Sequence, residues 1–182
     1  MRLFVAIEIE SDIRDRMEAF MQQWKTKISN ARWVRPQGLH ITLKFLGNVK
    51  DERRAGIEQA LRQIHAPRFQ ISVQGIGVFP NPKSPRVLWV GIRADDGLAS
   101  LAAQVDQQMV CNGFEPEKRA FSPHVTLARL KERSGKSEIE KALSVPESNF
   151  GTMTARAFHL YESNVSPQGS IYKQLNTFEL IS

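Results

Sequence analysis

Two short stretches of the chain, residues 40–43 and 124–127, carry side chains that could do acid–base chemistry. Each reads His-x-Thr-x, with an apolar residue at both x positions. A histidine, with an unperturbed pKa of about 6.5, can accept or donate a proton near neutral pH. One neutral and one protonated histidine could divide the work at a phosphodiester between a nucleophile and a leaving group. The threonine hydroxyls could donate hydrogen bonds to phosphoryl oxygens, so the pattern favours phosphoester chemistry without a metal.

Both stretches are predicted to be β-strands, because apolar and polar residues alternate along them. Side chains two positions apart point the same way in a strand, so each histidine shares a face with its threonine. In the first strand this places Leu39, Ile41, Leu43 and Phe45 on the core side and His40, Thr42 and Lys44 opposite. In the second it places Val125 and Leu127 inward and His124 and Thr126 outward.

The elements around these strands occur twice in the same order. In the first half we expect a strand at 3–9, a helix capped by Ser11, the first His-x-Thr-x strand, a helix capped by Asp51 and a strand at 69–79. The loop at 80–85 contains three prolines and is the candidate lobe crossing. In the second half we expect a strand at 88–92, a helix ending at 112–113 and the second His-x-Thr-x strand. These are followed by a helix with a capping box from Ser137 to Glu140, and by strands at 152–162 and 171–181 around a turn at 166–169.

A near-repeat of roughly 85 residues is too long for a solenoid unit. It predicts instead an α+β fold of two similar lobes, related by a pseudo-two-fold axis that brings the two histidines face to face. We therefore expect one bilobal domain over 1–182, with the near-repeat at 1–85 and 86–182. The alternative is coincidence, since a single His-x-Thr can occur in any sequence.

Composition narrows the class of protein. The 182 residues are 41% hydrophobic and 24% charged, which suits a globular protein, and the net charge of +6 suits a polyanionic partner or a merely basic surface. Cys111 is the single cysteine, so no intrachain disulfide can form. The first residues lack the pattern of a signal peptide, and no stretch is long and apolar enough to span a membrane. We expect a cytoplasmic protein with no membrane partner.

The paired motifs and their surroundings resemble the two-histidine (2H) phosphoesterase superfamily, and within it the RNA 2′,3′-cyclic phosphodiesterase (2′-5′ RNA ligase) family. The similarity extends over nearly the whole chain. Its segments are 2–7, 33–36, 39–47, 77–80, 86–91 and 121–129, followed by Ser163, Gly169 and Tyr172.

This resemblance implies a bilobal fold in which each lobe is an antiparallel sheet with helices on its outer face, and an active-site cleft between the lobes. It implies that His40 is the proton donor to the departing ribose oxygen and His124 the proton acceptor that activates water, while Thr42 and Thr126 hold the phosphate. The implied reaction opens RNA 2′,3′-cyclic phosphate ends, such as those of tRNA halves, to 2′-phosphates. The reverse direction is 2′-5′ ligation, which needs no ATP. We expect a monomer with no cofactor and no metal.

Two further positions follow the motifs at equal spacing. Phe45 resembles a base-stacking aromatic of the family, and Arg129 a phosphate-binding arginine. Strict alternation, however, puts both on the apolar side, so reaching the cleft requires a β-bulge or the end of the strand. The alternative for Phe45 is a plain core residue.

Other functions remain open from the sequence alone. The same motifs would serve a 2H phosphodiesterase acting on 2′,5′-linked oligonucleotides or small cyclic nucleotides, and a non-catalytic RNA-binding module would share the basic charge. His65 and His159 lie outside any motif and are assigned to the surface or the core. No carboxylate or cysteine stands at ligand spacing from His40 or His124, which disfavours a metal site there.

Overall fold

The computed structural model describes residues 1–132, 134–145, 148–167 and 169–182, and its strands form two antiparallel sheets. A four-stranded sheet has the order β3 (His40–Asn48), β1 (Arg2–Glu8), β8 (Ala157–Ser166) and β9 (Gly169–Glu179). A five-stranded sheet has the order β2 (Ala31–Trp33), β6 (His124–Leu130), β5 (Val87–Ala94), β4 (Phe69–Phe79) and β7 (Asn149–Ala155). The expected α+β class with two antiparallel lobes is confirmed.

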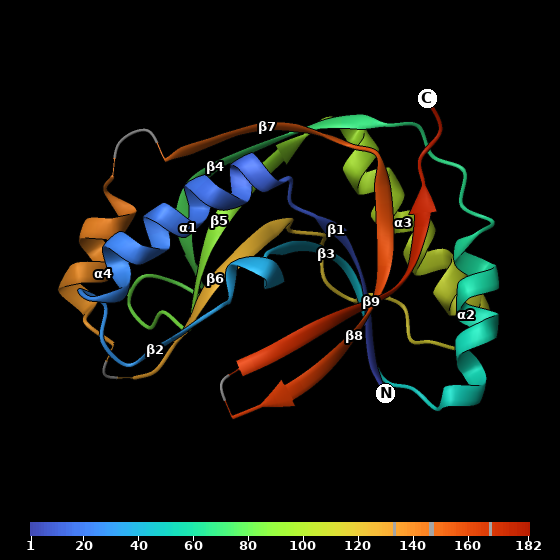
Figure 1. The fold of residues 1–182 in the computed structure, drawn as a ribbon, viewed down its shortest axis with the longest axis horizontal. Helices are drawn as coiled ribbons and strands as arrows, with labels where there is room; N and C mark the ends of the chain where they lie inside the picture. Colours follow the sequence, from blue (N-terminus) through green and yellow to red (C-terminus); the bar gives the residue numbers. More distant parts are fainter. Residues whose placement is uncertain (133, 146–147, 168) are drawn as a thin grey trace.

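Each sheet takes strands from both halves of the sequence. The first half supplies β1 and β3 to the four-stranded sheet but β2 and β4 to the five-stranded one. The helices α1 (Ser11–Lys25) and α4 (Lys136–Leu143) pack on the five-stranded sheet, whereas α3 (Asp96–Cys111) contacts β3, and α2 (Arg54–Leu61) packs against α3 (Figure 1). A lobe is therefore not one contiguous half of the chain, because elements cross between the sheets several times.

The proline-rich loop at 80–85 is not a lobe crossing. The strands β4 and β5 on either side of it pair antiparallel within one sheet, with Phe79 opposite Val87. The predicted strand at 152–162 is also wrong as one element, since it spans the end of β7 and the start of β8, which lie in different sheets. The chain changes sheets at Arg156, a short step that alternation of residue types does not reveal. Of the turn predicted at 166–169, Gln168 lies outside the described residues.

The three predicted helix caps are wrong, although the helices themselves form. Helix α1 has Glu10 rather than Ser11 at its N-cap, and no side chain bonds to its first turn. Asp51 begins a short 3₁₀ turn (Asp51–Arg53) that leads into α2, and Gly135 rather than Ser137 precedes α4. The ending of α3 at Asn112 and Gly113 is confirmed, with Gly113 at a positive φ of 80°.

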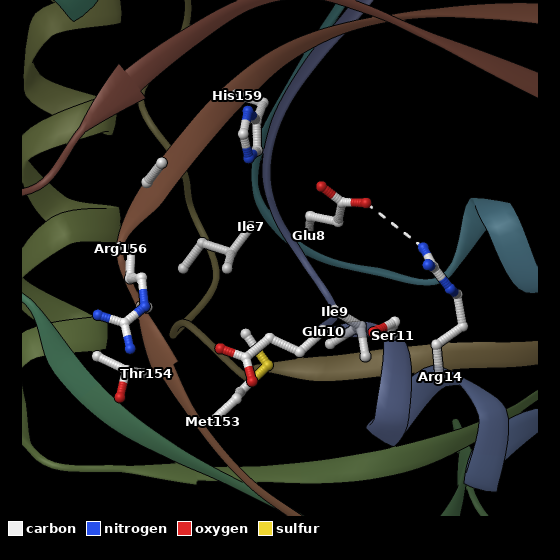
Figure 2. Close-up of a pocket in the computed structure, with 12 residues that line it drawn as sticks. Ile7, Glu8, Ile9, Glu10, Ser11, Arg14, Met153, Thr154, Arg156 and His159 are labelled. Atoms are coloured by element: carbon white, nitrogen blue, oxygen red, sulfur yellow. Dashed lines mark hydrogen bonds and ion pairs between the residues drawn. The ribbon is translucent and has the colours of Figure 1, made fainter.

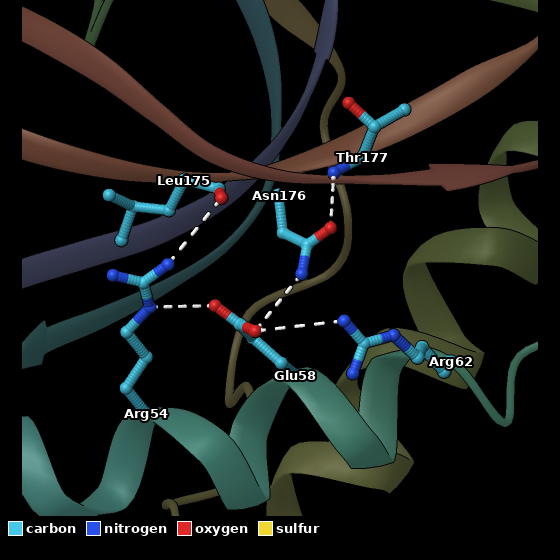
Figure 3. A network of polar contacts seen from close by, with 6 residues as sticks. All are labelled: Arg54, Glu58, Arg62, Leu175, Asn176 and Thr177. Atoms are coloured by element: carbon cyan, nitrogen blue, oxygen red, sulfur yellow. Dashed lines mark hydrogen bonds and ion pairs between the residues drawn. The ribbon is translucent and has the colours of Figure 1, made fainter.

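A polar network fastens α2 to the edge of the four-stranded sheet (Figure 3). The half-buried Glu58 accepts hydrogen bonds from Arg54 at 2.7 Å and from the Asn176 amide on β9 at 3.0 Å. Burial raises the pKa of the Glu58 carboxyl, but these two hydrogen bonds and the charges of Arg54 and Arg62 together lower it overall. This contact holds the outer helix on the sheet that carries His40. None of the helices in the described residues is long and apolar enough to cross a membrane.

Candidate functional site

The strands β3 and β6 bring the two His-x-Thr-x stretches together from different sheets. Ile41, Leu43, Val125 and Leu127 are buried as predicted, while the histidines and threonines between them are partly exposed. The strands contact each other where the two lobes meet, without sharing a ladder. A charge on His124 lowers the pKa of His40, so the two imidazoles lie within electrostatic reach of each other.

Both histidines are oriented by the same local contact. The Nδ1–H of His40 donates to the Gly38 carbonyl at 2.6 Å, and that of His124 donates to the Ser122 carbonyl at 2.8 Å. A carbonyl oxygen can only accept, so Nδ1 carries the proton and Nε2 is the nitrogen left to meet a substrate. The arrangement leaves either ring able to take a proton at Nε2 or, once charged, to give one up.

Aromatic rings enclose His40. The ring of Phe4 lies 4.8 Å from the imidazole, and those of Tyr172 and Tyr161 lie at 5.1 and 6.4 Å between centroids. Phe4 and Tyr161 are also stacked on each other at 5.2 Å between centroids, a favourable arrangement for two aromatic rings. Sequence reasoning did not assign these rings to the site, because only the pairing of β1, β8 and β9 reveals that they share the face of His40.

His124 has an equivalent but smaller aromatic wall. Phe79 meets its ring edge-on at 4.9 Å, and Trp89 lies at 6.4 Å. The indole of Trp89 rests directly over Gly77, where any Cβ would enter the ring. The glycine on β4 therefore leaves room for the Trp89 ring beside His124.

A β-bulge follows the threonine in each motif. Thr42 and Lys44 oppose consecutive residues of β1, and Thr126 and Ala128 oppose consecutive residues of β5, so Leu43 and Leu127 are the extra residues. Beyond each bulge the alternation is inverted: Phe45 is 64% exposed and Arg129 is exposed. The structure thus places Phe45 on the face of His40 and Arg129 on the face of His124. The bulges explain why strict alternation had put these two residues on the apolar side.

Lys44 is the residue that the first bulge turns inward. The prediction that it shares the polar face with His40 is wrong, since Lys44 is 5% exposed. Its ammonium pairs with Asp106 of α3 and donates to the Glu115 carbonyl at 2.9 Å. The buried ion pair thus joins β3 to the helix behind it.

Burial dominates the electrostatics of His40. Burial lowers its pKa, the hydrogen bond to Gly38 raises it, and charge on His124 lowers it, with a result of about 4. Free His40 is therefore neutral at pH 7. A negatively charged phosphodiester beside it would favour the imidazolium and raise this pKa again.

We predict that this shift makes the folded protein less stable as the pH falls from 6.5 toward 4. In that window the unfolded chain binds a proton at His40 that the folded protein excludes. The contribution of neutral His40 to the free energy of unfolding is therefore fully present above pH 6.5 and declines below it. From pH 7 to pH 5 the free energy of unfolding should fall by about 2 kcal/mol because of His40. Denaturant unfolding of wild type and His40→Gln at both pH values measures it. An equal loss of stability in the two proteins would contradict the assignment.

One pocket lies apart from the two motifs. It has a volume of about 320 Å³ at the end of β1 and the crossing from β7 to β8, and Glu8, Arg14, Arg156 and His159 line it (Figure 2). Glu8 is paired with Arg14 at 3.4 Å. His159 is 8% exposed, and its Nδ1 lies 3.1 Å from the Thr177 hydroxyl, which agrees with its assignment outside the motifs. None of the predicted site residues lines this pocket.

Among the described residues, no group of three or more histidine, cysteine, aspartate or glutamate side chains is placed to hold a metal ion. The side chains that β3 and β6 place at the junction of the lobes include two imidazoles, two threonine hydroxyls and the guanidinium of Arg129.

Comparison with known proteins agrees with this geometry. The family model described as LigT like Phosphoesterase matches the chain twice in succession, at residues 7–89 and 90–172. An RNA 2′,3′-cyclic phosphodiesterase of Archaeoglobus fulgidus is 38% identical over 98% of this chain and 100% of its own length, and one of Methanothermobacter thermautotrophicus is 31% identical over 98% of each. Two crystal structures superpose over nearly the whole chain. A Thermus thermophilus protein has a TM-score of 0.84 and 26% identity, and the superposition covers 99% of this chain and 98% of that one. Escherichia coli LigT complexed with 3′-AMP has a TM-score of 0.80 and 28% identity, with 100% of this chain and 98% of that one covered.

Proposed function

Because the chain belongs to the LigT-like phosphoesterase family, we propose that it hydrolyses RNA 2′,3′-cyclic phosphate ends to 2′-phosphomonoesters. The observation that carries this proposal is the pair of histidines on β3 and β6, each with Nδ1 fixed by a backbone carbonyl and Nε2 left for the substrate. Relatives of nearly equal length carry the name of this activity.

In the proposed mechanism His124 acts as the base and His40 as the acid. Nε2 of His124 takes a proton from water as the water oxygen forms a bond to phosphorus. The bond from phosphorus to the ribose 3′ oxygen breaks, and protonated His40 gives that oxygen its proton. Because free His40 is neutral at pH 7, the bound phosphodiester must supply the negative charge that favours its protonated form.

The neighbouring side chains would hold the substrate. Thr42 and Thr126 share the faces of the histidines and can donate hydrogen bonds to the non-bridging phosphoryl oxygens. Arg129 can pair with phosphate through its guanidinium, and the exposed ring of Phe45, 6.0 Å from Phe4, can stack on a base. No metal or other cofactor has a role in this scheme.

The decisive experiment is incubation of the protein with an RNA that ends in a 2′,3′-cyclic phosphate, followed by identification of the product. The expected product is a 2′-monophosphate, formed at the same rate in EDTA. A 3′-monophosphate would reverse the choice of leaving oxygen, and an intact substrate would overturn the proposal. A panel with 2′,5′-linked oligonucleotides and small cyclic nucleotides tests the alternative substrates, while salt-sensitive RNA binding without turnover would indicate a binding module.

The 2′-5′ ligation would use the same acid–base steps, with the 5′-hydroxyl of a second RNA in place of water. His124 would take the proton of that hydroxyl as its oxygen bonds to phosphorus, and His40 would again protonate the departing 3′ oxygen.

We also propose a cytoplasmic, monomeric enzyme, with tRNA halves among its substrates. Size-exclusion chromatography with light scattering tests the oligomeric state.

We predict that Phe45→Ala raises KM for RNA substrates about tenfold, because stacking on one base is worth ~1–3 kcal/mol. The ring is 64% exposed, so its loss leaves the melting temperature nearly unchanged. Phe45→Tyr keeps the ring face and should retain a KM near that of wild type. If Phe45→Ala keeps the wild-type KM, the residue does not contact the substrate.

A further inference from the structure

Two arginines lie directly opposite each other in the ladder between β2 and β6. Arg32 pairs with Arg129, and both side chains are exposed. Opposed residues of an antiparallel pair project to the same face. Arg129 shares the face of His124 beyond the bulge, so Arg32 lies on that face as well, while its neighbour Trp33 packs against the core.

This pairing is unfavourable for the protein by itself. Like charges placed directly opposite each other on neighbouring strands are destabilising. Among the described residues, no carboxylate forms an ion pair with Arg32 or Arg129. Two guanidinium groups side by side and free of internal counterions are well suited to a bound phosphate.

The positive charge continues past the end of β6. A pocket of about 220 Å³ lies there, and its lining includes four cationic side chains and one carboxylate: Lys83, Arg86, Lys131, Lys136 and Glu132. The carboxylate is paired with Arg86 at 3.1 Å, which leaves three lysines without an ion pair in the described part of the chain. The loop between β4 and β5 is tied to β6 by the Leu130 N–H, which donates to the Arg86 carbonyl at 2.8 Å.

Cationic side chains thus lie toward the end of β6 that is away from His124: Arg129, Arg32 opposite it on β2, and then those that line this pocket. We propose that these residues bind the phosphate backbone of the RNA strand that leads to the cyclic end, with Arg32 at the first phosphate upstream and the pocket at phosphates farther along. This inference rests on the proposed function and deepens it, because it makes a chain of nucleotides, rather than a cyclic mononucleotide, the preferred substrate.

Two substrates with the same terminal nucleotide test the proposal: a nucleoside 2′,3′-cyclic phosphate and an eight-nucleotide RNA that ends in it. Wild type is expected to have the higher kcat/KM on the RNA. Arg32→Ala should lower the ratio of kcat/KM between RNA and mononucleotide about tenfold, as expected for the loss of one charge-assisted contact. Lys131→Glu with Lys136→Glu should lower the same ratio. Arg62→Ala, which removes one positive charge from α2 in the other lobe, is the matched control and should leave the ratio unchanged.

A second measurement does not depend on turnover. Binding of an eight-nucleotide RNA that ends in a 2′-phosphate, followed by fluorescence anisotropy at several salt concentrations, should weaken with salt, and the slope should fall by about 0.7 in Arg32→Ala. Equal kcat/KM ratios for wild type and both variants, or an unchanged salt slope, would overturn the proposed backbone site. Failure of wild type to hydrolyse either substrate would overturn the proposed function alone, since the salt slope would still report on the binding site.

Discussion

Replacing either His40 or His124 with alanine is expected to lower kcat by at least about 10²-fold, the usual contribution of a general acid or base. Each ring is fixed by a hydrogen bond from Nδ1 to the carbonyl two residues earlier, so each alanine removes a positioned proton carrier. The double variant should be little worse than either single one, because the two residues act as a unit. Single-turnover hydrolysis of an RNA with a cyclic end measures the loss.

The chain offers a matched control for these variants. His65 donates from Nδ1 to the Gln63 carbonyl at 2.9 Å, the same local geometry, but lies outside the motifs and is exposed. His65→Ala should therefore keep the wild-type rate. Full hydrolysis by the double variant His40→Ala/His124→Ala in a clean preparation would refute two-histidine catalysis. In wild type, the pH–rate profile should be bell-shaped, as expected when one histidine acts as acid and the other as base.

The largest stability effect is expected at the ion pair between Lys44 on β3 and Asp106 on α3. Asp106→Ala would leave the Lys44 ammonium buried without a counterion, which costs about 3 kcal/mol. Lys44→Met should cost less, because the Asp106 carboxylate is partly exposed and still accepts from the Glu117 N–H at 3.0 Å. Denaturant unfolding at pH 7 measures both free energies.

The double variant Lys44→Met/Asp106→Leu removes both charges but keeps an apolar side chain at each position, so it distinguishes the effect of charge from that of packing. If the cost of Asp106→Ala comes from an uncompensated charge, the double variant should be more stable than Asp106→Ala. A greater loss in Lys44→Met than in Asp106→Ala would contradict this account. Lys44 lies next to the extra residue of the bulge, beyond which Phe45 is exposed on the face of His40. The KM for RNA of the stable variants should therefore show whether the ion pair helps to hold Phe45 on that face.

The two motif strands show how much alternation can predict. Period-2 patterning assigned Ile41 and Leu43 to the core and His40 and Thr42 to the opposite face, and the structure confirms each placement. The assignment fails at Lys44 and inverts at Phe45. A bulge is set by the pairing of two strands, and one strand's residue types do not report its partner's register.

The same limit applies to the lobes and to the helix starts. Matching elements in the two halves indicated two similar lobes, yet strands and helices cross between the sheets, which only long-range pairing decides. The caps at Ser11, Asp51 and Ser137 fail because several residues near each helix start can cap it, and tertiary packing selects the first turn.

The sequence by itself predicted the candidate acid–base site of this protein: two histidines, each two residues before a threonine, on strands whose other face is core. Those assignments need only local periodicity and the proton affinity of imidazole. Tertiary structure alone decided which rings enclose His40, how burial lowers its pKa, and that Arg32 stands opposite Arg129. These properties arise between strands that are distant in the chain, where register, burial and solvent exclusion are set by the packed fold.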